Sequence, residues 1–578
     1  MSGFSSALRR FVAIAAIVTL ASCGRPAEET AHYDTIIKGG TVYDGTGAPG
    51  IQADVGVNGD RIAFIGDLSH ASADKTVDAK GQAVSPGFVN MLSWATDSLV
   101  IDGRGLSDTI QGVTLEVFGE GWSMGPFSPK IKADYQHKLD QTPQPYKVTW
   151  TGLGEYMDML QKKGISPNVA SFVGATTVRM NHVGYANRAP TPDELKAMEG
   201  EVATAMKEGA LGVGSSLIYA PAFYAKTDEL VALAKVAGEY GGRYISHMRN
   251  EGNQLMPALE ELITIAKDAH VPAEIYHLKA AGQQNWGKLD KLIKRVNEAN
   301  KNGLDISANM YNYAAGATGL DAAMPPWVQE GTQEDWAKRL QDPEIRKKLQ
   351  VEMTTPTNKW DNLLMAAGAD GVLLPYFQNP ALKKYTGWTL AQVAKDMNET
   401  PEKAAMDLVI QDGTRVAAIY FLMNEDNIKK KIKLPWVAFG SDAGAYNPEV
   451  AKKFGGAHPR AYGNVARLLG HYVRDEKVIS LAEAIHKLSG LPTKRLKIRD
   501  RGFLKPGYYA DIVVFNPKTI ADHSTYKDPH HLSTGVDDVF VNGVEIVKDG
   551  KHTGAMAGRF VHGPGWTGWK KKDEEAKS

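Results

Sequence analysis

The chain has 578 residues, of which 43% are hydrophobic and 23% are charged, and these values are typical of a folded globular protein. Its 66 basic side chains balance its 66 acidic ones, so the sequence lacks the positive charge that nucleic-acid-binding proteins use. The balanced charge makes a small neutral or mildly polar substrate the expectation. The length favours one large barrel with added segments, or two to three domains.

The first 22 residues have the pattern of a secretory signal peptide. Arg9 and Arg10 precede an apolar run at 11–20, which is short for a membrane span. The run ends in L-A-S-C, which resembles the processing site of bacterial lipoproteins, so Cys23 is predicted to carry a lipid. We expect an exported lipoprotein, anchored only by this lipid and facing the periplasm or the cell exterior. A plain signal peptide or an uncleaved anchor is the alternative.

Cys23 is the only cysteine in the sequence. Disulfides are therefore excluded, and any metal site has to use His, Asp, Glu or a modified Lys. Residues 23–33 contain Gly, Pro, Ala and Glu and are predicted to form a short tether between the lipid and the folded part of the chain.

Short alternating apolar runs at both ends of the mature chain predict a single small β-sandwich domain. They fill residues 34–86, where Asn58-Gly59-Asp60 joins two runs with the chemistry of a hairpin turn. Residues 500–560 have the same character, with runs at 510–516 and 536–547. Because the two groups are alike and far apart in sequence, we expect them to pair in one domain.

Residues 87–499 alternate strand-like runs with helical patterns, which predicts an α/β fold with a TIM-like (β/α)8 barrel. The helical patterns include Pro192–Glu208 and Thr227–Tyr240. Residues 315–431 are too long for one crossover and are predicted to form an inserted subdomain. The charged tail at 563–578 is expected to be flexible. The strand-like runs lie at 168–174, 210–214, 243–247, 273–277, 305–309 and 436–442.

Four polar residues are predicted to lie at the carboxyl ends of barrel strands, where barrel enzymes gather their catalytic groups: Glu120, His247, His277 and Asp442. The two histidines end neighbouring strands, so their side chains could converge, and two imidazoles with a carboxylate make a zinc site with an open position for water. Asp442 could ligate the metal or accept a proton from its water. A lone histidine at a strand end is more often structural, and the glycines that flank Glu120 also suit an ordinary turn.

Across nearly the whole mature chain the sequence resembles the D-aminoacylase (N-acyl-D-amino-acid deacylase) family of the amidohydrolase superfamily. Each shared string is moderately specific, whereas their common order and spacing are strongly so. The strings are K-G-G-T-V-Y-D-G-T-G, G-A-L-G-V-G-S-S-L-I-Y-A-P, Y-I-S-H-M-R-N-E-G, Y-H-L-K-A-A-G, F-G-S-D-A, H-P-R-A-Y-G and L-K-P-G-Y-Y-A-D-I-V-V-F.

The resemblance implies a role for each matching residue. His247 and His277 match the histidines that hold the tightly bound zinc, and Glu120 stands where the best-known members have a cysteine ligand. Asp442 matches the aspartate that activates the water. Arg460, in H-P-R, matches the guanidinium that receives the substrate carboxylate, for which its bidentate fork is suited.

Other residues are implied to lie on the substrate side of the site. Lys279, Tyr311 and Tyr313 belong to this group, although tyrosines near a strand end commonly fill the core. Arg249 is placed similarly, with a structural ion pair as the alternative to substrate contact.

The sequence departs from the family at residues 86–94, which read P-G-F-V-N-M-L-S-W in place of P-G-F-I-D-x-H-x-H. Leu92 and Trp94 stand at the two histidine positions and cannot ligate a cation. The resemblance implies that those histidines serve a second, weakly held metal, so we expect one zinc ion per chain. Leu92 and Trp94 are then expected to form an apolar wall of the pocket.

The sequence therefore predicts a mono-zinc hydrolase in which metal-activated water attacks the amide bond of small N-acyl amino acids, with D-stereochemistry expected. A dipeptidase or cyclic-amide hydrolase of the same superfamily is an alternative. So is an inactive, lipid-anchored binding protein, or a two-metal site that uses a carboxylated Lys279. The sequence does not fix the acyl group or the oligomeric state.

Overall fold

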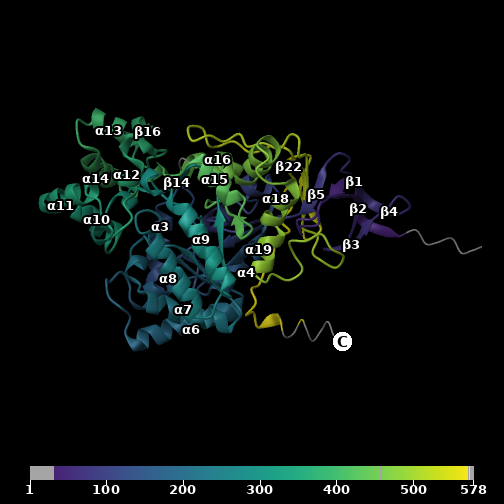
Figure 1. The fold of residues 1–578 in the computed structure, drawn as a ribbon, viewed down its shortest axis with the longest axis horizontal. Coiled ribbons are helices and arrows are strands. Elements are labelled where there is room, and N and C mark those ends of the chain that lie inside the picture. Colours follow the sequence, from purple (N-terminus) through teal and green to yellow (C-terminus); the bar gives the residue numbers. More distant parts are fainter. Residues whose placement is uncertain (1–30, 455–457, 570–571, 573–578) are drawn as a thin grey trace, which may run out of the picture.

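The computed structural model describes residues 31–454, 458–569 and 572. The predicted signal peptide, Cys23 with its predicted lipid and most of the predicted tether lie outside these residues. Figure 1 shows three parts in a row: a β-domain at one end, a barrel in the middle and a helical subdomain at the other end. The predicted fold class is confirmed.

The barrel is built from parallel strands that form two adjoining sheets among the described residues. Most of their residues are buried and apolar on both faces, as expected for strands enclosed by helices. The amide of Met91 donates to the carbonyl of Phe439 (3.1 Å), which closes the ring between its first and last strands. In order the strands are β6 (Phe88–Asn90), β7 (Val113–Phe118), β8 (Asn168–Ser171) continued by β9 (Val173–Gly174), β10 (Gly212–Ser216), β11 (Arg243–His247), β12 (Ala273–Ile275), β13 (Ile306–Met310) and β18 (Val437–Phe439).

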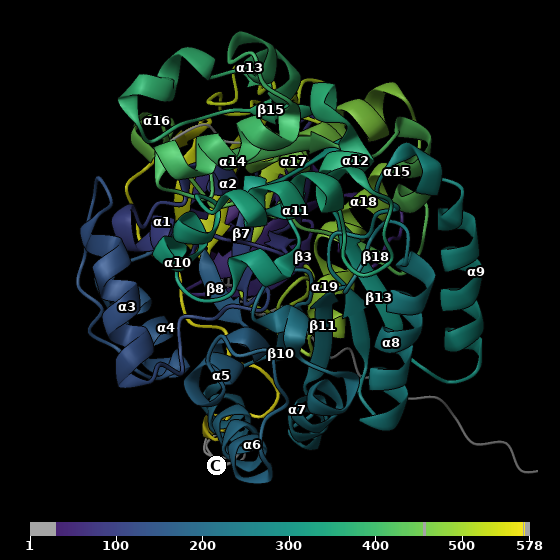
Figure 2. The ribbon, with the colours of Figure 1, turned by 90° about the vertical axis from the view of Figure 1, so that its left-hand side faces the viewer.

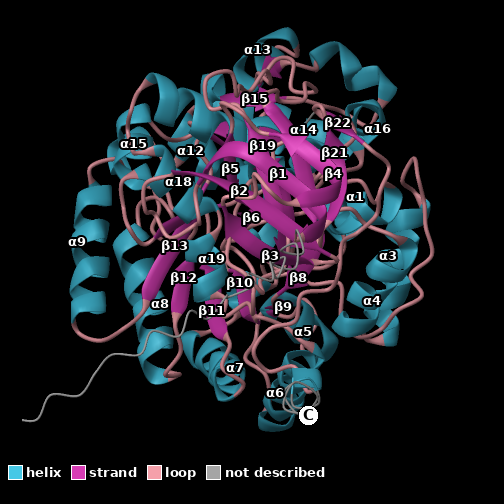
Figure 3. Cartoon of the chain, turned by 90° about the vertical axis from the view of Figure 1, so that its right-hand side faces the viewer, coloured by secondary structure: helices cyan, strands magenta, loops and turns pink. Residues whose placement is uncertain are grey.

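Helices surround this ring of strands (Figure 3). The predicted helix at Pro192–Glu208 is found with those bounds, and its Thr191 cap, proline at the first turn and Gly209 after the last turn explain why. The covering helices include α4 (Leu153–Lys163), α5 (Ala175–His182), α6 (Pro192–Glu208), α7 (Thr227–Glu239), α8 (Leu255–Asp268), α9 (Lys288–Lys301), α15 (Glu425–Ile432), α17 (Arg460–Arg467), α18 (Leu481–Leu488) and α19 (Gly490–Arg495), with α1 (Thr96–Ile101), α2 (Leu106–Thr109) and α3 (Pro129–Asp140) near the first two strands.

The β-domain joins strands from both ends of the described chain in one sheet. Its order is β22-β21-β20-β19-β5-β1-β2-β3, and β4 pairs with β1. The predicted hairpin at Asn58-Gly59 connects β2 to β3. The strands are β1 (His32–Val42), β2 (Ile51–Asn58), β3 (Arg61–Gly66), β4 (Ser72–Asp78), β5 (Ala83–Pro86), β19 (Ile512–Phe515), β20 (Val536–Val541), β21 (Val544–Lys548) and β22 (Lys551–His552).

The inserted subdomain leaves the barrel after β13 and returns at α15. It has its own apolar core, and Figure 2 shows its helices in front of the barrel strands. It contains a small antiparallel sheet in the order β14-β17-β15-β16. Its elements are β14 (Ala315–Gly319), α10 (Gln333–Arg339), α11 (Pro343–Thr354), α12 (Leu363–Ala367), β15 (Val372–Leu374), β16 (Trp388–Thr389), α13 (Leu390–Asp396), α14 (Pro401–Asp412) and β17 (Ala417–Phe421).

The expectation of a flexible tail from residue 563 is wrong for residues 563–569. The amide of Gly563 donates to Gly209 (2.8 Å) and that of Thr567 to Lys207 (3.1 Å), which ties the segment to the end of α6. Trp566 stacks on His562, with ring centroids 3.7 Å apart. Within the described part of the chain, no helix has both the length and the apolar character needed to cross a membrane.

Candidate metal centre and active site

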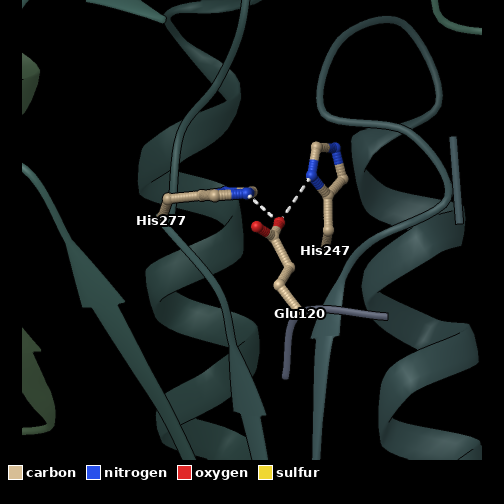
Figure 4. A group of neighbouring side chains, drawn as sticks. All are labelled: Glu120, His247 and His277. Atoms are coloured by element: carbon tan, nitrogen blue, oxygen red, sulfur yellow. Dashed lines mark hydrogen bonds and ion pairs between the residues drawn. The ribbon is translucent and has the colours of Figure 1, made fainter. Parts of the chain in front are cut away.

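Glu120, His247 and His277 meet at the carboxyl ends of three barrel strands, as predicted (Figure 4). Glu120 follows β7, His247 ends β11 and His277 follows β12. Their side chains are buried, and one candidate ligand atom from each lies within 4.8 Å of the others. Glu120 Oε1 is 3.1 Å from Nδ1 of His247 and 2.8 Å from Nε2 of His277.

The outward-facing nitrogens of both histidines approach one carboxylate, that of Glu251. His277 Nδ1 lies 3.1 Å from Glu251 Oε1, and His247 Nε2 lies 3.5 Å from Glu251 Oε2. A carboxylate behind a ligating histidine favours the tautomer that leaves the inner nitrogen free for a metal. Nζ of Lys279 also lies 2.7 Å from His277 Nδ1, so this nitrogen faces an ammonium as well as the carboxylate. Nε2 of His247 makes no hydrogen bond among the described residues, so Glu251 acts on it as a charge 3.5 Å away. The donor set therefore fits a zinc ion held by Glu120, His247 and His277.

The charges of this cluster are strongly coupled. Burial alone would raise the pKa of the Glu120 carboxyl, but His277 and His247 outweigh it and hold that pKa well below its usual range. Burial and Lys279 act to lower the pKa of His277, whereas Glu251 and Glu120 raise it to about 9. The two carboxylates thus favour the protonated form of His277, so the cluster stabilises positive charge at the place where a cation would bind.

Asp442 stands beside this cluster at the end of β18 and contacts two further side chains. Its Oδ2 is 2.9 Å from Nη1 of Arg460, and its Oδ1 accepts a hydrogen bond from Nε1 of Trp94 (3.1 Å). Burial raises the pKa of Asp442, while Arg460 acts against that shift. Nε and Nη1 of Arg460 are buried, and neither makes a hydrogen bond in the described ranges.

A cavity of about 520 Å³ opens above these groups, and the side chains that line it are within reach of a bound substrate. Lys279, Tyr311, Arg460 and Trp94 line it. The ammonium of Lys279 lies 2.7 and 2.8 Å from the two oxygens of Glu251, and the guanidinium of Arg460 lies 4.5 Å from the centre of the Tyr311 ring. A carboxylated Lys279 would replace this ion pair by two facing anions.

Three of the predicted substrate residues do not line this cavity. Leu92 is 1% exposed and packs in the barrel core, because its side chain points inward from the end of β6. Tyr313 packs in the core of the inserted subdomain, with its hydroxyl 3.4 Å from Asp522. Arg249 forms a bidentate pair with Glu261 (both 2.8 Å), so the structural alternative is the correct one. The expectation of an apolar wall is also wrong for Trp94, because its indole N–H donates to the carboxylates of Glu120 and Asp442.

Sequence reasoning missed Glu251 and the part that the inserted subdomain plays. Glu251 lies four residues after His247 in H-M-R-N-E, and that spacing was the only local signal. Its amide donates to Asp361 of the subdomain (2.8 Å), a contact that no sequence pattern indicates. The subdomain also supplies Thr318, Leu363, Arg415 and Leu422 to the cavity lining.

Comparison with known proteins decides the family. The chain is 32% identical over 531 residues to a D-aminoacylase of Alcaligenes xylosoxydans xylosoxydans, covering 92% of this chain and 97% of that protein. The chain belongs to the D-aminoacylase family of amidohydrolases. A sequence model of the amidohydrolase family also matches residues 364–547. This member of the D-aminoacylase family is thus a metal-dependent amidohydrolase.

Two solved structures of the family resemble the chain closely. One is a D-aminoacylase with a binuclear metal centre, described as activated by one metal and attenuated by the second; it has a TM-score of 0.76 at 30% identity and covers 92% of this chain and 100% of its own. The other is the N-acyl-D-glutamate deacylase of Bordetella bronchiseptica in complex with zinc and a phosphonate inhibitor. It has a TM-score of 0.75 at 28% identity, with the same coverage.

Proposed function

We propose that this protein is a zinc-dependent hydrolase that cleaves the amide bond of N-acyl-D-amino acids and holds one zinc ion. The observation that carries the proposal is the convergence of Glu120, His247 and His277 with Asp442 and Arg460 in one cavity. The metal specificity and the D-preference are supported by the zinc-containing and D-specific relatives.

Each of these residues has a defined task in the proposed reaction. Glu120, His247 and His277 would hold the zinc, which when bound supplies Lewis-acid polarisation of the amide carbonyl and a more acidic water. The Asp442 carboxylate accepts the proton of the attacking water and delivers it to the leaving amine. The Arg460 fork pairs with the substrate carboxylate, and Tyr311 lies against the guanidinium and limits its movement.

The test is a screen of N-acyl-D- and N-acyl-L-amino acids, with dipeptides and cyclic amides in the same panel, together with zinc analysis of the same sample. We expect hydrolysis of the D-series and about one zinc per chain. His247→Ala should lose the zinc. Asp442→Asn should keep it and lose activity by about 10²- to 10⁴-fold, the usual range for a general base.

Two outcomes would separate the alternatives. Zinc-loaded protein that cleaves only dipeptides or cyclic amides would replace the proposed substrate by another of the superfamily. Metal-free protein that binds an N-acyl amino acid without cleaving it would identify a binding protein, and the proposed function would be falsified.

We also propose that the protein is exported and carries a lipid on Cys23. The sequence pattern around this cysteine supports the proposal. Labelling cells with a radioactive or clickable fatty acid should mark the wild-type chain and leave Cys23→Ser unmarked, and the substituted chain should leave the membrane fraction.

A further inference from the structure

Trp94 reaches the active site from the loop after β6 and donates its indole N–H between two carboxylates. Nε1 lies 3.0 Å from Oε2 of Glu120 and 3.1 Å from Oδ1 of Asp442. The backbone amide of Trp94 donates to the carbonyl of Ala443 (2.9 Å), the residue after Asp442. The ring and the aspartate are therefore held side by side by main chain as well as by side chain.

The position between these carboxylates is one that requires a positive or hydrogen-bonding group. Glu120 is 5% exposed, and the Asp442 side chain is 12% exposed. Two buried carboxylates that face each other repel unless a cation or donor lies between them. The indole nitrogen is a donor only and cannot ligate a metal, so Trp94 satisfies the two carboxylates by hydrogen bonding.

A related protein, the D-aminoacylase with a binuclear metal centre, is activated by one metal and attenuated by the second. In this chain the remaining oxygens of both carboxylates are committed: Glu120 Oε1 faces the two histidines, and Asp442 Oδ2 faces Arg460. A second cation would have to displace the indole to reach both acids.

We infer that Trp94 is a positioning residue whose indole N–H takes the place of a second metal, holding Asp442 oriented toward the site and restricting the chain to one zinc ion. This inference rests on the proposed function for its catalytic part and on metal binding alone for its second part. It assigns Trp94 a polar task instead of the apolar wall expected from the sequence.

Trp94→Phe tests the N–H separately from the ring. This variant should bind one zinc per chain, because Glu120, His247 and His277 are intact. Its kcat on the substrate found in the screen should fall about 10- to 100-fold, while KM stays within about threefold, since Arg460 still receives the substrate. Trp388→Phe is the matched control: Trp388 lies in the inserted subdomain and, like Trp94, is 37% exposed, and this variant should keep wild-type kcat and zinc content.

Trp94→His tests the exclusion of the second metal by zinc analysis alone. An imidazole there offers a ligand to a cation between Glu120 and Asp442. After dialysis against excess zinc, this variant should retain about two zinc ions per chain, whereas wild type retains one. Circular dichroism of each variant verifies that it is folded.

Wild-type kcat in Trp94→Phe would overturn the positioning role. Two tightly held zinc ions in the wild type, or one in Trp94→His, would overturn the exclusion of a second metal. If the wild type cleaves no N-acyl amino acid at all, the proposed function fails, while the zinc counts still decide the metal-exclusion part of the inference.

Discussion

Two residues of the active site adopt left-handed backbone conformations, which only glycine and a few polar residues visit readily. They are His277 (φ 33°) and Asp442 (φ 51°), each just past the end of its strand. Neighbouring strands hold them: the His277 amide donates to Oδ1 of Asn309 (2.8 Å), and the Asp442 amide donates to the carbonyl of Leu92 (2.8 Å). Such strain costs on the order of 1–3 kcal/mol per residue and is stored mainly at functional sites. Leu92 thus serves the site through its main chain.

Glu251 should control metal affinity without ligating the metal. We expect Glu251→Gln to weaken zinc binding about 10- to 100-fold, because the change removes the negative charge that faces the outer nitrogens of both histidines. A competition titration against a zinc chelator of known affinity measures this change. Glu261→Gln is the control, since Glu261 pairs with Arg249 outside the cluster and its loss should leave zinc affinity unchanged. Equal affinity in the two variants would show that Glu251 does not support the ligands.

The ligands themselves could be predicted because a strand-end histidine is a local feature of the sequence. His247 and His277 close apolar runs, and parallel strands bring such ends together. Glu251 and Trp94 could not be assigned in this way, because their contacts join loops whose conformations depend on the rest of the fold. The direction of Leu92 was also hidden, since the short strand β6 gives no alternation from which to read a face.

At the scale of elements, the barrel strands and helices were predictable and the aromatic C-terminal segment was not. Its G-P-G-W-T-G-W sequence has no period, and its order comes from ring packing against α6 and against itself. His562 lies between Phe560 and Trp566, with ring centroids 4.1 and 3.7 Å away. The small sheet of the inserted subdomain escaped prediction for a similar reason, because β14 reads A-G-A-T-G, in which only Thr318 has a side chain that favours strands.

His562 should make the stability of the protein fall in mild acid. Burial first, and Lys572 second, lower the pKa of His562 to about 4, below the value near 6.5 expected in the unfolded chain. The folded state therefore favours the neutral ring. The stabilisation is complete above about pH 6.5 and is lost as the pH falls toward 4, because the unfolded chain then binds the proton more readily.

Comparing His562→Phe with His562→Gln separates titration from stacking. Between pH 7 and 5, the wild type should lose about 1–2 kcal/mol of unfolding free energy more than His562→Phe, which keeps the ring but cannot be protonated. His562→Gln should also lack this pH dependence and should be less stable than His562→Phe at pH 8. Urea unfolding followed by circular dichroism gives both quantities. An unchanged pH dependence in His562→Phe would assign the acid sensitivity to other groups.

At the scale of the whole molecule, the β-domain and the barrel are joined by a buried polar network. Asn542, just after β20, is 3% exposed and has a left-handed backbone (φ 51°). Its side-chain amide donates to Oδ1 of Asn168 in barrel strand β8 (2.9 Å) and to the carbonyl of Ala557 (2.7 Å), and its oxygen accepts from Nη2 of Arg501 (2.7 Å). Arg501 is also paired with Asp511 of the β-domain. The Asn542 side chain thus connects barrel strand β8 to the segments that contain Arg501 and Ala557.

Asn542→Gly should destabilise the whole molecule and not only the β-domain. Glycine accepts the left-handed backbone at no steric cost, so the change removes the amide alone and leaves the Arg501 guanidinium and the Ala557 carbonyl short of a buried partner. We expect a loss of about 2–3 kcal/mol in unfolding free energy. Asn398→Gly is the matched control: its backbone is also left-handed (φ 54°), but the side chain is exposed in the inserted subdomain, and the change should stay within about 0.5 kcal/mol. Because the network crosses the boundary between the β-domain and the barrel, urea transitions followed by circular dichroism and by zinc release should shift together in Asn542→Gly. A shift in the first without the second would mean that the barrel keeps its metal site independently of the β-domain.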